Sequence, residues 1–333
     1  GDPPPTVSVL IKSYNHAAYI RQTIDSILTQ SFQDFEIVAT DDASTDGTAD
    51  ILRAYKDPRL KLEVSPVNLG ISGAMNATIA RARGKYVAIL NSDDWALPHR
   101  LERQVAYLEG NPSAALVFGL PRTIGENDEP IQGYNDFAAP LHFPNYSREL
   151  WLRYFFYNSN CLSAPTAMIR RAAYGIVGLY DRRLTNLQDF DMWIRMLLAG
   201  YDIHILPEEL TAVRIRANNA NMSAPTWDKL TRTEFELGKI LRRFATLDTR
   251  SLDALFGDAL GGPRTAGKAA LLRLAELALR DPRRVYRAFA LDLIYENAAD
   301  QADFDWLREL AANLDTSGSW AIAELRSRLS QGD

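Results

Sequence analysis

The sequence predicts an α/β protein, a doubly wound, mostly parallel sheet with an appended all-helical region on its C-terminal side. Two patterns carry this prediction. Over residues 6–119, short apolar runs alternate with segments of about ten residues whose apolar positions have the spacing of a helix. Such alternation is typical of a parallel sheet covered by helices. Beyond residue 226 the chain shows only helical patterns, rich in Ala, Leu and Arg.

The alternation starts with "TVSVLIKSY" (Thr6–Tyr14), a β-branched run that predicts the first strand. A helical pattern follows, with Ile20, Ile24 and Ile27 on one face. "FEIVATDDAS" predicts a second strand that ends in acidic residues, and "TDGTADILRAY" predicts a capped helix after it. Further along come the strand "LKLEVS", a helix over residues 71–82, the strand "KYVAIL", a helix whose first turn tolerates Pro98, and the strand "AALVFG".

The second half of this region is less regular. Pro, Gly, Asn and Asp over residues 125–145 predict a long functional loop. "SRELWLRYFFY" then has five aromatic residues within seven positions, which favours a core helix over a sugar-stacking platform. Within residues 186–216, Phe190, Trp193, Ile194 and Leu197 share one helix face. We expect one domain over residues 1–223, with halves at about 1–119 and 120–223, and a helical domain over residues 224–333.

The composition limits the partners and compartments of the protein. The net charge is −5, so the chain lacks the basic balance that a nucleic acid partner requires. The single cysteine, Cys161, excludes an internal disulfide and fits a reducing compartment, and we expect it to be a small buried hydrophobe. No run of about eighteen apolar residues is present, so no segment is expected to span a bilayer. These features predict a cytoplasmic globular protein that does not bind nucleic acid.

Polar side chains gather where the predicted strands end. In a doubly wound sheet the carboxyl ends of the strands meet at one edge, and ligands bind there. Ser13 and Tyr14 follow the first strand, Asp41 and Asp42 the second, and Asn91–Asp94 ("NSDD") the fourth. Neither GxxxxGK[ST] nor GxGxxG follows the first strand, so a phosphate bound here would need a cation between it and the carboxylates. Carboxylate oxygens suit Mg²⁺ or Mn²⁺.

A simpler interpretation of "NSDD" is a turn or helix cap ahead of Pro98, because Ser and Asp side chains accept hydrogen bonds from the first backbone N–H groups of a helix. The second acidic strand end, Asp41–Asp42, favours the metal site, because capping does not easily explain two unrelated acidic strand ends. The sequence therefore predicts a site for a metal ion and a diphosphate at this edge of the sheet.

Three ordered motifs resemble the inverting glycosyltransferases of family 2, which have the GT-A fold, a Rossmann-like α/β fold. The motifs are "VSVLIKSYNHAAYIRQTIDSILTQSFQDFEIVATDDASTDGT", "NLGISGAMNATIARARGKYVAILNSDDW" and "LQDFDMWIRM". The resemblance covers about Thr6 to Ser223 and leaves out the helical region. It implies sugar transfer from a nucleoside diphosphate sugar, with a nucleotide-sugar half at about 1–119 and an acceptor half at about 120–223.

By position, the resemblance implies that Tyr14 and Asp42 contact the nucleotide base. A carboxylate can accept the ring N3–H of uracil or thymine, which favours a uridine nucleotide. "NSD" matches the family's DxD triplet, so Asp93 is expected to bind Mn²⁺ or Mg²⁺ on the diphosphate. The residues expected to bind the donor, beside Asp93 as the metal ligand, are Ser13, Tyr14, Asp42, Asn76, Asn91, Ser92, Arg214 and Arg216.

The resemblance also implies a general base. Asp189 matches the second residue of the family's "ED" pair, which is the base, and Asp191 on the other side of the same helix face is the alternative. From its position alone, Asp189 is more simply a first-turn acid favoured by the helix dipole. The chain departs from the family at Asn91, Gln188 and Met75, where the family has Asp, Glu and often Arg. The missing Arg bears on which nucleotide and sugar are held, and leaves the reaction type unchanged.

The remaining candidates have weaker patterns. Arg214 and Arg216 are expected either to close on the diphosphate, because guanidinium groups bind phosphate in a bidentate way, or to be solvated charges on an edge strand. Trp193, Asn158 and Asn160 are candidate acceptor contacts. No metal-ligand spacing connects the four histidines, His16, His99, His142 and His204.

The sequence thus predicts a metal-dependent inverting glycosyltransferase, a hexosyl- or N-acetylhexosaminyltransferase that uses a UDP-sugar. Its acceptor is expected to be a glycan or lipid-linked glycan of polysaccharide biosynthesis. We expect the helical domain to associate with the inner face of the membrane or to form a homo-oligomer. Two alternatives stay open. One is a nucleotidyltransferase, although no glycine-rich basic segment follows the first strand, and the other is a catalytically inactive glycan- or partner-binding protein, which the three departures would fit.

Overall fold

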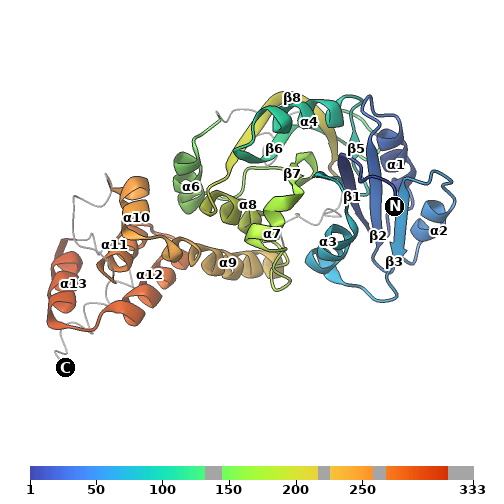
Figure 1. Cartoon of the computed structure of the whole chain (residues 1–333). Coiled ribbons are helices and arrows are strands. Elements are labelled where there is room, and N and C mark those ends of the chain that lie inside the picture. Colours follow the sequence, from blue (N-terminus) through green and yellow to red (C-terminus); the bar gives the residue numbers. More distant parts are fainter. Residues whose placement is uncertain (132–144, 217–225, 258–267, 314–333) are drawn as a thin grey trace. The chain divides into compact units, whose positions relative to one another are not determined.

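The computed structural model of the protein describes residues 1–131, 145–216, 226–257 and 268–313 (Figure 1). The chain divides into two compact units, Gly1–Pro225 and Thr226–Asp333. The first unit is built around an eight-stranded sheet of order β3-β2-β1-β4-β7-β6-β8-β5. The described part of the second unit contains only helices and their connections. The predicted α/β fold with a helical C-terminal region is therefore confirmed.

Four parallel strands form the N-terminal half of the sheet. They are β1 (Val7–Ser13), β2 (Phe35–Asp41), β3 (Leu60–Val64) and β4 (Tyr86–Ile89). The helices that follow the first three strands are α1 (Ile20–Leu28), α2 (Thr48–Arg53) and α3 (Gly70–Arg81). β1, β2 and β4 are buried along their whole length except at Lys12, as expected for strands with helices on both faces. Ser13 lies opposite Asp41, so the ends of β1 and β2 meet at one edge.

The other half of the sheet has mixed strand directions. β6 (Ala114–Ile124) and β8 (Asp202–Arg214) are parallel, whereas β7 (Met168–Arg170) is antiparallel to β4 and β6, and β5 (Trp95–Ala96) is antiparallel to β8. The sheet is therefore mixed, with four parallel and three antiparallel pairs of neighbouring strands. β5 and β7 have two and three residues, too few for the alternation that marks a strand in a sequence. Neither strand was predicted.

The helices of this half are α4 (Arg100–Gly110), α6 (Arg148–Tyr157), α7 (Arg171–Val177) and α8 (Gln188–Leu198), with the short helix η2 (Ala164–Thr166). Trp151, Phe155 and Phe156 of α6 are fully buried, which confirms the interpretation of the aromatic segment as a core helix. The ring of Phe155 packs edge-on against Phe190 of α8, with 5.2 Å between the centroids. This contact anchors α8, whose first turn carries Asp189.

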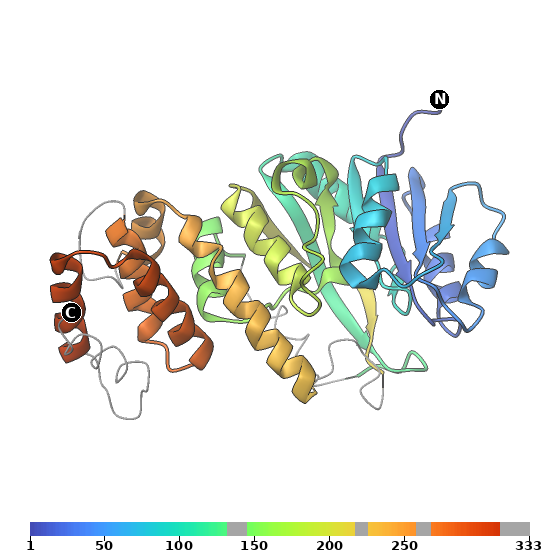
Figure 2. The ribbon, with the colours of Figure 1, turned by 90° about the horizontal axis from the view of Figure 1, so that it is seen from below.

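The second unit contains α9 (Trp227–Leu241), η3 (Phe244–Thr246), α10 (Thr249–Phe256), α11 (Lys268–Leu279), α12 (Arg284–Asn297) and α13 (Gln301–Asn313). Figure 2 shows α9 as the long helix with which this unit begins, and α12 packs against both α9 and α11. No described helix of either unit is long and apolar enough to cross a membrane. Most of the predicted loop 125–145 and the predicted domain boundary at residues 223–224 lie outside the described residues.

Candidate active site

The turn after β4 separates two adjacent aspartates. Asp94 points into the fold, where its Oδ1 accepts the backbone N–H of Arg214 at 2.8 Å. The hydroxyl of Thr23 also donates to the backbone carbonyl of Asp94, at 2.6 Å. Burial, and next the charge of Asp93, raise the pKa of Asp94 well above its usual range. Asp94 therefore fastens the turn to β8 and is not presented to a ligand.

Asp93 is the aspartate of this turn that lies at the site. Its side chain is 11% exposed, and its Oδ2 lies 3.5 Å from Nε of Arg216 and 4.0 Å from Nε2 of His16. The ring of His16 is held in place, because its Nδ1 lies 2.6 Å from the hydroxyl of Ser92. Burial lowers the pKa of His16, with Asp93 acting in the opposite direction. Sequence spacing gave no sign of His16, because 76 residues separate it from Ser92.

The turn after β2 also separates two aspartates. Asp41 is fully buried, and its carboxylate accepts the hydroxyls of Ser13 and Ser44, each at 2.7 Å. Oδ1 of Asp42 accepts the backbone N–H of Leu69 at 2.6 Å. The hydroxyl of Ser13, which we expected to bind the donor, instead holds Asp41 in the turn.

Lys12 connects the acids of the two turns with α8. Its ammonium group interacts electrostatically with Asp189, Asp42 and Asp93, which raise its pKa, whereas burial, the larger effect, lowers it. Three of the acids predicted from separate motifs thus act electrostatically on one cation. The sequence did contain a signal for this role, because a lysine interrupts the apolar run of β1. That signal was missed.

The two aspartates of α8 have different surroundings. Asp189 is partly buried, and burial raises its pKa while the charge of Lys12 lowers it. Asp191 is 1% exposed, and its Oδ2 lies 3.4 Å from Nη1 of Arg195 on the same helix. Asp191 is therefore a buried, ion-paired residue, and the structure does not support it as the alternative base. Asp189 is the acid of α8 that interacts with the site.

Arg214 does not have the role predicted for it. Its side chain is 1% exposed, and its guanidinium donates to the backbone carbonyls of Asp93 and Gly125, each at 2.8 Å. It also donates to Oε1 of Gln22 at 2.9 Å and pairs with Asp128 at 2.9 Å. These contacts tie together the turns after β4 and β6, so the guanidinium is committed to the fold rather than to a diphosphate.

Both arginines of this segment lie over one aromatic ring. The guanidinium carbons of Arg214 and Arg216 are 4.4 Å and 6.0 Å from the ring centroid of Tyr19. A guanidinium over the face of an aromatic ring is attracted by the ring quadrupole. Tyr19 therefore helps to place Arg216 beside Asp93.

Two further predicted contacts are part of the fold. The side-chain amide of Asn76 both donates to and accepts from the backbone of Tyr180, at 2.9 and 3.0 Å. Trp193 is fully buried and packs edge-on against Phe118, with 5.1 Å between the ring centroids. An acceptor sugar cannot reach a ring in this position. The helical spacing of apolar residues, which placed Trp193 on the apolar face of its helix, predicted its burial correctly.

Three predicted contacts stay accessible or partly so. Tyr14 is 50% exposed and directly follows β1. Asn158 is exposed, and its side chain donates to the carbonyl of Tyr154 at the end of α6. Asn160 is partly buried, and its Oδ1 accepts the backbone N–H of Leu162. Both asparagines therefore make hydrogen bonds to the backbone that shape the chain after α6.

The donor set around Asp93 fits a divalent ion only in part. Within the described ranges, no group of three or more His, Cys, Asp or Glu side chains could hold a metal ion. Asp93 and His16 offer a carboxylate oxygen and an imidazole nitrogen 4.0 Å apart, about twice a metal–ligand bond of ~2.1 Å. Two such ligands suit Mn²⁺ when a bound substrate supplies the remaining oxygens.

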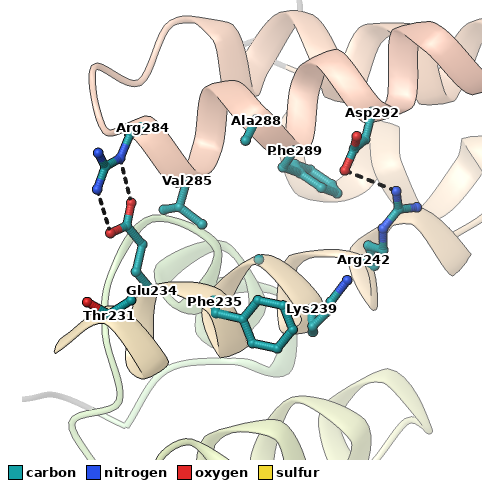
Figure 3. A pocket seen from close by; sticks show the side chains of 11 residues that line it. Thr231, Glu234, Phe235, Lys239, Arg242, Arg284, Val285, Ala288, Phe289 and Asp292 are labelled. Atoms are coloured by element: carbon teal, nitrogen blue, oxygen red, sulfur yellow. Dashed lines mark hydrogen bonds and ion pairs between the residues drawn. The ribbon is translucent and has the colours of Figure 1, made fainter. Parts of the chain in front are cut away.

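A pocket of the second unit lies between α9 and α12 (Figure 3). Four of its charged groups form ion pairs within that unit, Arg284 with Glu234 at 3.0 Å and Arg242 with Asp292 at 3.3 Å, and Lys239 lies over the ring of Phe235. Ion pairs bridge the pocket between the two helices. We assign no chemistry to it.

Solved structures share the architecture of this chain. The structure of S. aureus TarS 1–349 in complex with UDP-GlcNAc has a TM-score of 0.57 and 19% sequence identity, over 89% of this chain and 93% of that chain. TarS 1–349 in complex with UDP has a TM-score of 0.52 and 18% identity over the same shares. The fold is that of the GT-A glycosyltransferases, as the sequence predicted.

Sequence comparisons identify the family within that fold. The family model for Glycosyl transferase family 2 matches residues 8–176. An uncharacterized glycosyltransferase of Methanocaldococcus jannaschii is 32% identical over 215 residues, which are 63% of this chain and 71% of that protein. The Escherichia coli enzyme WfaP, a UDP-Glc:alpha-D-GlcNAc-diphosphoundecaprenol beta-1,3-glucosyltransferase, is 27% identical over 226 residues, 68% of this chain and 83% of WfaP. The chain belongs to glycosyl transferase family 2 and is a glycosyltransferase, which confirms the resemblance.

Proposed function

We propose that the protein transfers a sugar from a UDP-sugar to a hydroxyl of a glycan or lipid-linked glycan, with inversion at the sugar carbon. The observation that carries this proposal is the electrostatic interaction of Lys12 with Asp42, Asp93 and Asp189, which follow β2, follow β4 and begin α8. The names of similar proteins support the substrate class. WfaP uses UDP-Glc and a diphosphoundecaprenol-linked sugar, and TarS was solved with UDP-GlcNAc.

In this proposal the nucleotide base contacts Tyr14 and Asp42. The half-exposed ring of Tyr14 offers a stacking surface at the end of β1. The hydrogen bond from Leu69 to Oδ1 of Asp42 fixes the orientation of that carboxylate. An ionised carboxylate can only accept hydrogen bonds, so Asp42 suits the N3–H of uracil.

The diphosphate is placed beside Asp93. Asp93 and His16 would hold Mn²⁺ or Mg²⁺, and the bound ion would supply positive charge to the leaving group. Lys12, which interacts with Asp93, adds fixed positive charge from the protein, and Arg216 beside Asp93 supplies a second cation. Positive groups that are already in place stabilise charge as it develops on the leaving diphosphate, because the site need not reorganise during the reaction.

Asp189 is the proposed general base. The acceptor hydroxyl attacks C1 of the sugar from the face opposite the diphosphate, the bond from C1 to the diphosphate oxygen breaks, and the hydroxyl proton passes to Asp189. Burial raises the pKa of Asp189, which makes the carboxylate a better proton acceptor. The charge of Lys12 limits that rise and so favours the ionised form that the reaction needs.

The helical unit offers a surface for a membrane-bound acceptor or a second copy of the chain. Trp227, Leu230 and Phe235 of α9 are 86%, 52% and 54% exposed. Aromatic and aliphatic side chains on one helix suit the surface of a membrane or an oligomer interface. We place the reaction on the cytoplasmic side, where a chain with one cysteine stays reduced.

The test is release of nucleoside diphosphate across a panel of nucleotide sugars, with Mn²⁺, with Mg²⁺ and with EDTA. Wild type is compared with Asp93→Ala and Asp189→Ala. We expect release from a UDP-sugar that EDTA and Asp93→Ala abolish. A nucleotidyltransferase would release pyrophosphate instead, and a binding protein would release neither product. Wild type that binds no nucleotide with or without metal, measured by calorimetry, would overturn the proposal.

A further inference from the structure

A cation of the protein already lies against the carboxylate to which the proposed function assigns the metal ion. Nε of Arg216 is 3.5 Å from Oδ2 of Asp93, and the two side chains are only 19% and 11% exposed. Partly buried charges are screened by salt much less than surface pairs are. The pair is therefore a substantial electrostatic feature of the site before any ligand binds.

Arg216 differs from Arg214 in what its guanidinium contacts. Arg214 is tied to backbone carbonyls of two turns. Ile215, which lies between them, donates its backbone N–H to the carbonyl of Ile124 at 2.8 Å. The backbone just before Arg216 is therefore held against the end of β6. Arg216 thus extends from an anchored strand end to Asp93. A guanidinium carries five N–H donors, so it can also contact an anion bound beside that carboxylate.

The charge balance has a consequence for the order of binding. Asp93 and Arg216 together carry no net charge, so they offer a free divalent ion little attraction. A nucleoside diphosphate brings both negative charge and oxygen ligands, and guanidinium groups bind phosphate oxygens well. The donor therefore gives Arg216 a second partner and the ion a more negative site.

We propose that Arg216 couples metal binding to donor binding: it neutralises Asp93 in the free protein and releases it when the diphosphate arrives, so that ion and donor bind together. This inference rests on the proposed function, because it takes Asp93 as the metal ligand and a nucleoside diphosphate as the donor. Linkage requires the coupling to be reciprocal, so Mn²⁺ must raise the affinity for UDP by the same factor by which UDP raises the affinity for Mn²⁺.

The experiment measures Mn²⁺ binding to the full chain by electron paramagnetic resonance, with and without UDP. Arg216→Met removes the charge and keeps much of the side-chain volume, and Arg216→Lys keeps the charge. Arg122→Met is a matched control, because Arg122 forms an ion pair with Glu209 at 2.7 Å on the same sheet. We expect Arg216→Met to bind Mn²⁺ alone about tenfold more tightly than wild type, with a correspondingly smaller effect of UDP. Both other variants should bind as wild type does.

Two outcomes overturn the inference. The first is an Arg216→Met variant that binds Mn²⁺ alone no more tightly than Arg122→Met. The second is a gain in affinity that persists when Asp93→Asn is added, because the ion would then lie elsewhere. Wild type that binds no UDP in the presence of Mn²⁺ is a separate result, which contradicts the donor assignment of the proposed function. If Arg216→Met does not fold, Arg216→Gln serves in its place with the same expected gain.

Discussion

The acidic pairs at the ends of β2 and β4 look alike in the sequence, but the fold uses them in opposite order. After β2 the first aspartate, Asp41, is internal and accepts hydroxyl groups. After β4 the second, Asp94, is internal and accepts a backbone N–H. The other member of each pair, Asp42 or Asp93, interacts with Lys12 at the site.

The difference shows what decides the role of an aspartate in such a pair. A buried carboxylate is tolerated where donors are available to it, and each internal aspartate has at least one donor from a distant segment, Ser13 for Asp41 and Arg214 for Asp94. Order within the dipeptide carries no information about this. We therefore expect variants of the internal aspartates to lose stability and variants of the site aspartates to lose function.

The largest expected effect concerns Asp189, the third acid that interacts with Lys12. Asp189→Asn should lower kcat for sugar transfer by about 10³-fold, because a carboxamide cannot take the acceptor proton. The affinity for UDP, measured by calorimetry, should stay unchanged. Asp191→Asn is the matched control on the same helix, and we expect it to lower the melting temperature instead, because it breaks a buried ion pair. More than a tenth of wild-type kcat in Asp189→Asn would place the base elsewhere.

The adjacent pair Asp93 and Asp94 gives the sharpest contrast. Asp93→Ala should lower kcat/KM by about 10²-fold while it shifts the unfolding transition less than Asp94→Ala does. Asp94→Ala leaves the backbone N–H of Arg214 without its acceptor and should destabilise the fold by about 1–3 kcal/mol. Turnover and urea denaturation of both variants check this. Equal losses of stability in the two variants would contradict the division of roles.

The pair after β2 should repeat the contrast with a smaller functional effect. Asp41→Ala removes the acceptor of two hydroxyls and should cost about 1–3 kcal/mol of unfolding free energy. Asp42→Asn keeps an oxygen for the N–H of Leu69 and loses the charge, so we expect UDP to bind about tenfold more weakly to a fold of normal stability. Denaturation curves and UDP calorimetry separate the two results, and a normal UDP affinity in Asp42→Asn would count against its contact with the base.

The smallest expected effect concerns Lys12, which interacts with both Asp42 and Asp93. Burial raises the pKa of Asp189 and Lys12 lowers it, so removing the lysine charge should raise that pKa further. Activity that needs ionised Asp189 is lost as the pH falls through this pKa. The acid limb of the kcat profile of Lys12→Met should therefore lie at higher pH than in wild type, and Lys12→Arg should restore it. An unmoved acid limb would show that Lys12 does not act on the base.

Features that depend on neighbours in the chain could be predicted from the sequence. The parallel strands β1 to β4 were predicted because their apolar runs are long enough to show. The roles of Asp93 and Asp189 were taken from the resemblance to the family, because position alone favoured a first-turn acid for Asp189, and they stay predictions. The two-residue strand β5 and the three-residue strand β7 carry no periodicity. The hydrogen bond that turns Asp94 inward spans 120 residues, and no local pattern encodes it.

The misassigned residues follow the same physical division. Arg214 and Asn76 are residue types that often bind a nucleotide sugar, but partners 89 and 104 residues away hold them inside the fold. His16 was set aside because histidines were judged by spacing, although its partner Ser92 lies in the motif already chosen. The sequence was enough to find the polar and charged residues at the strand ends. The structure was needed to tell which of them hold the fold together and which face the site.

The placement of two arginines over the ring of Tyr19 also limits how this segment can diverge among related genes. Arg214 and Arg216 lie over the same ring because one residue separates them in an extended chain, in which side chains two positions apart share a face. Point substitutions at either codon change one contact at a time. Gain or loss of a single codon between them would turn Arg216 to the opposite face and remove it from Asp93 in one step. We therefore expect functional descendants of this gene to vary here by substitution and to keep the length of the segment constant.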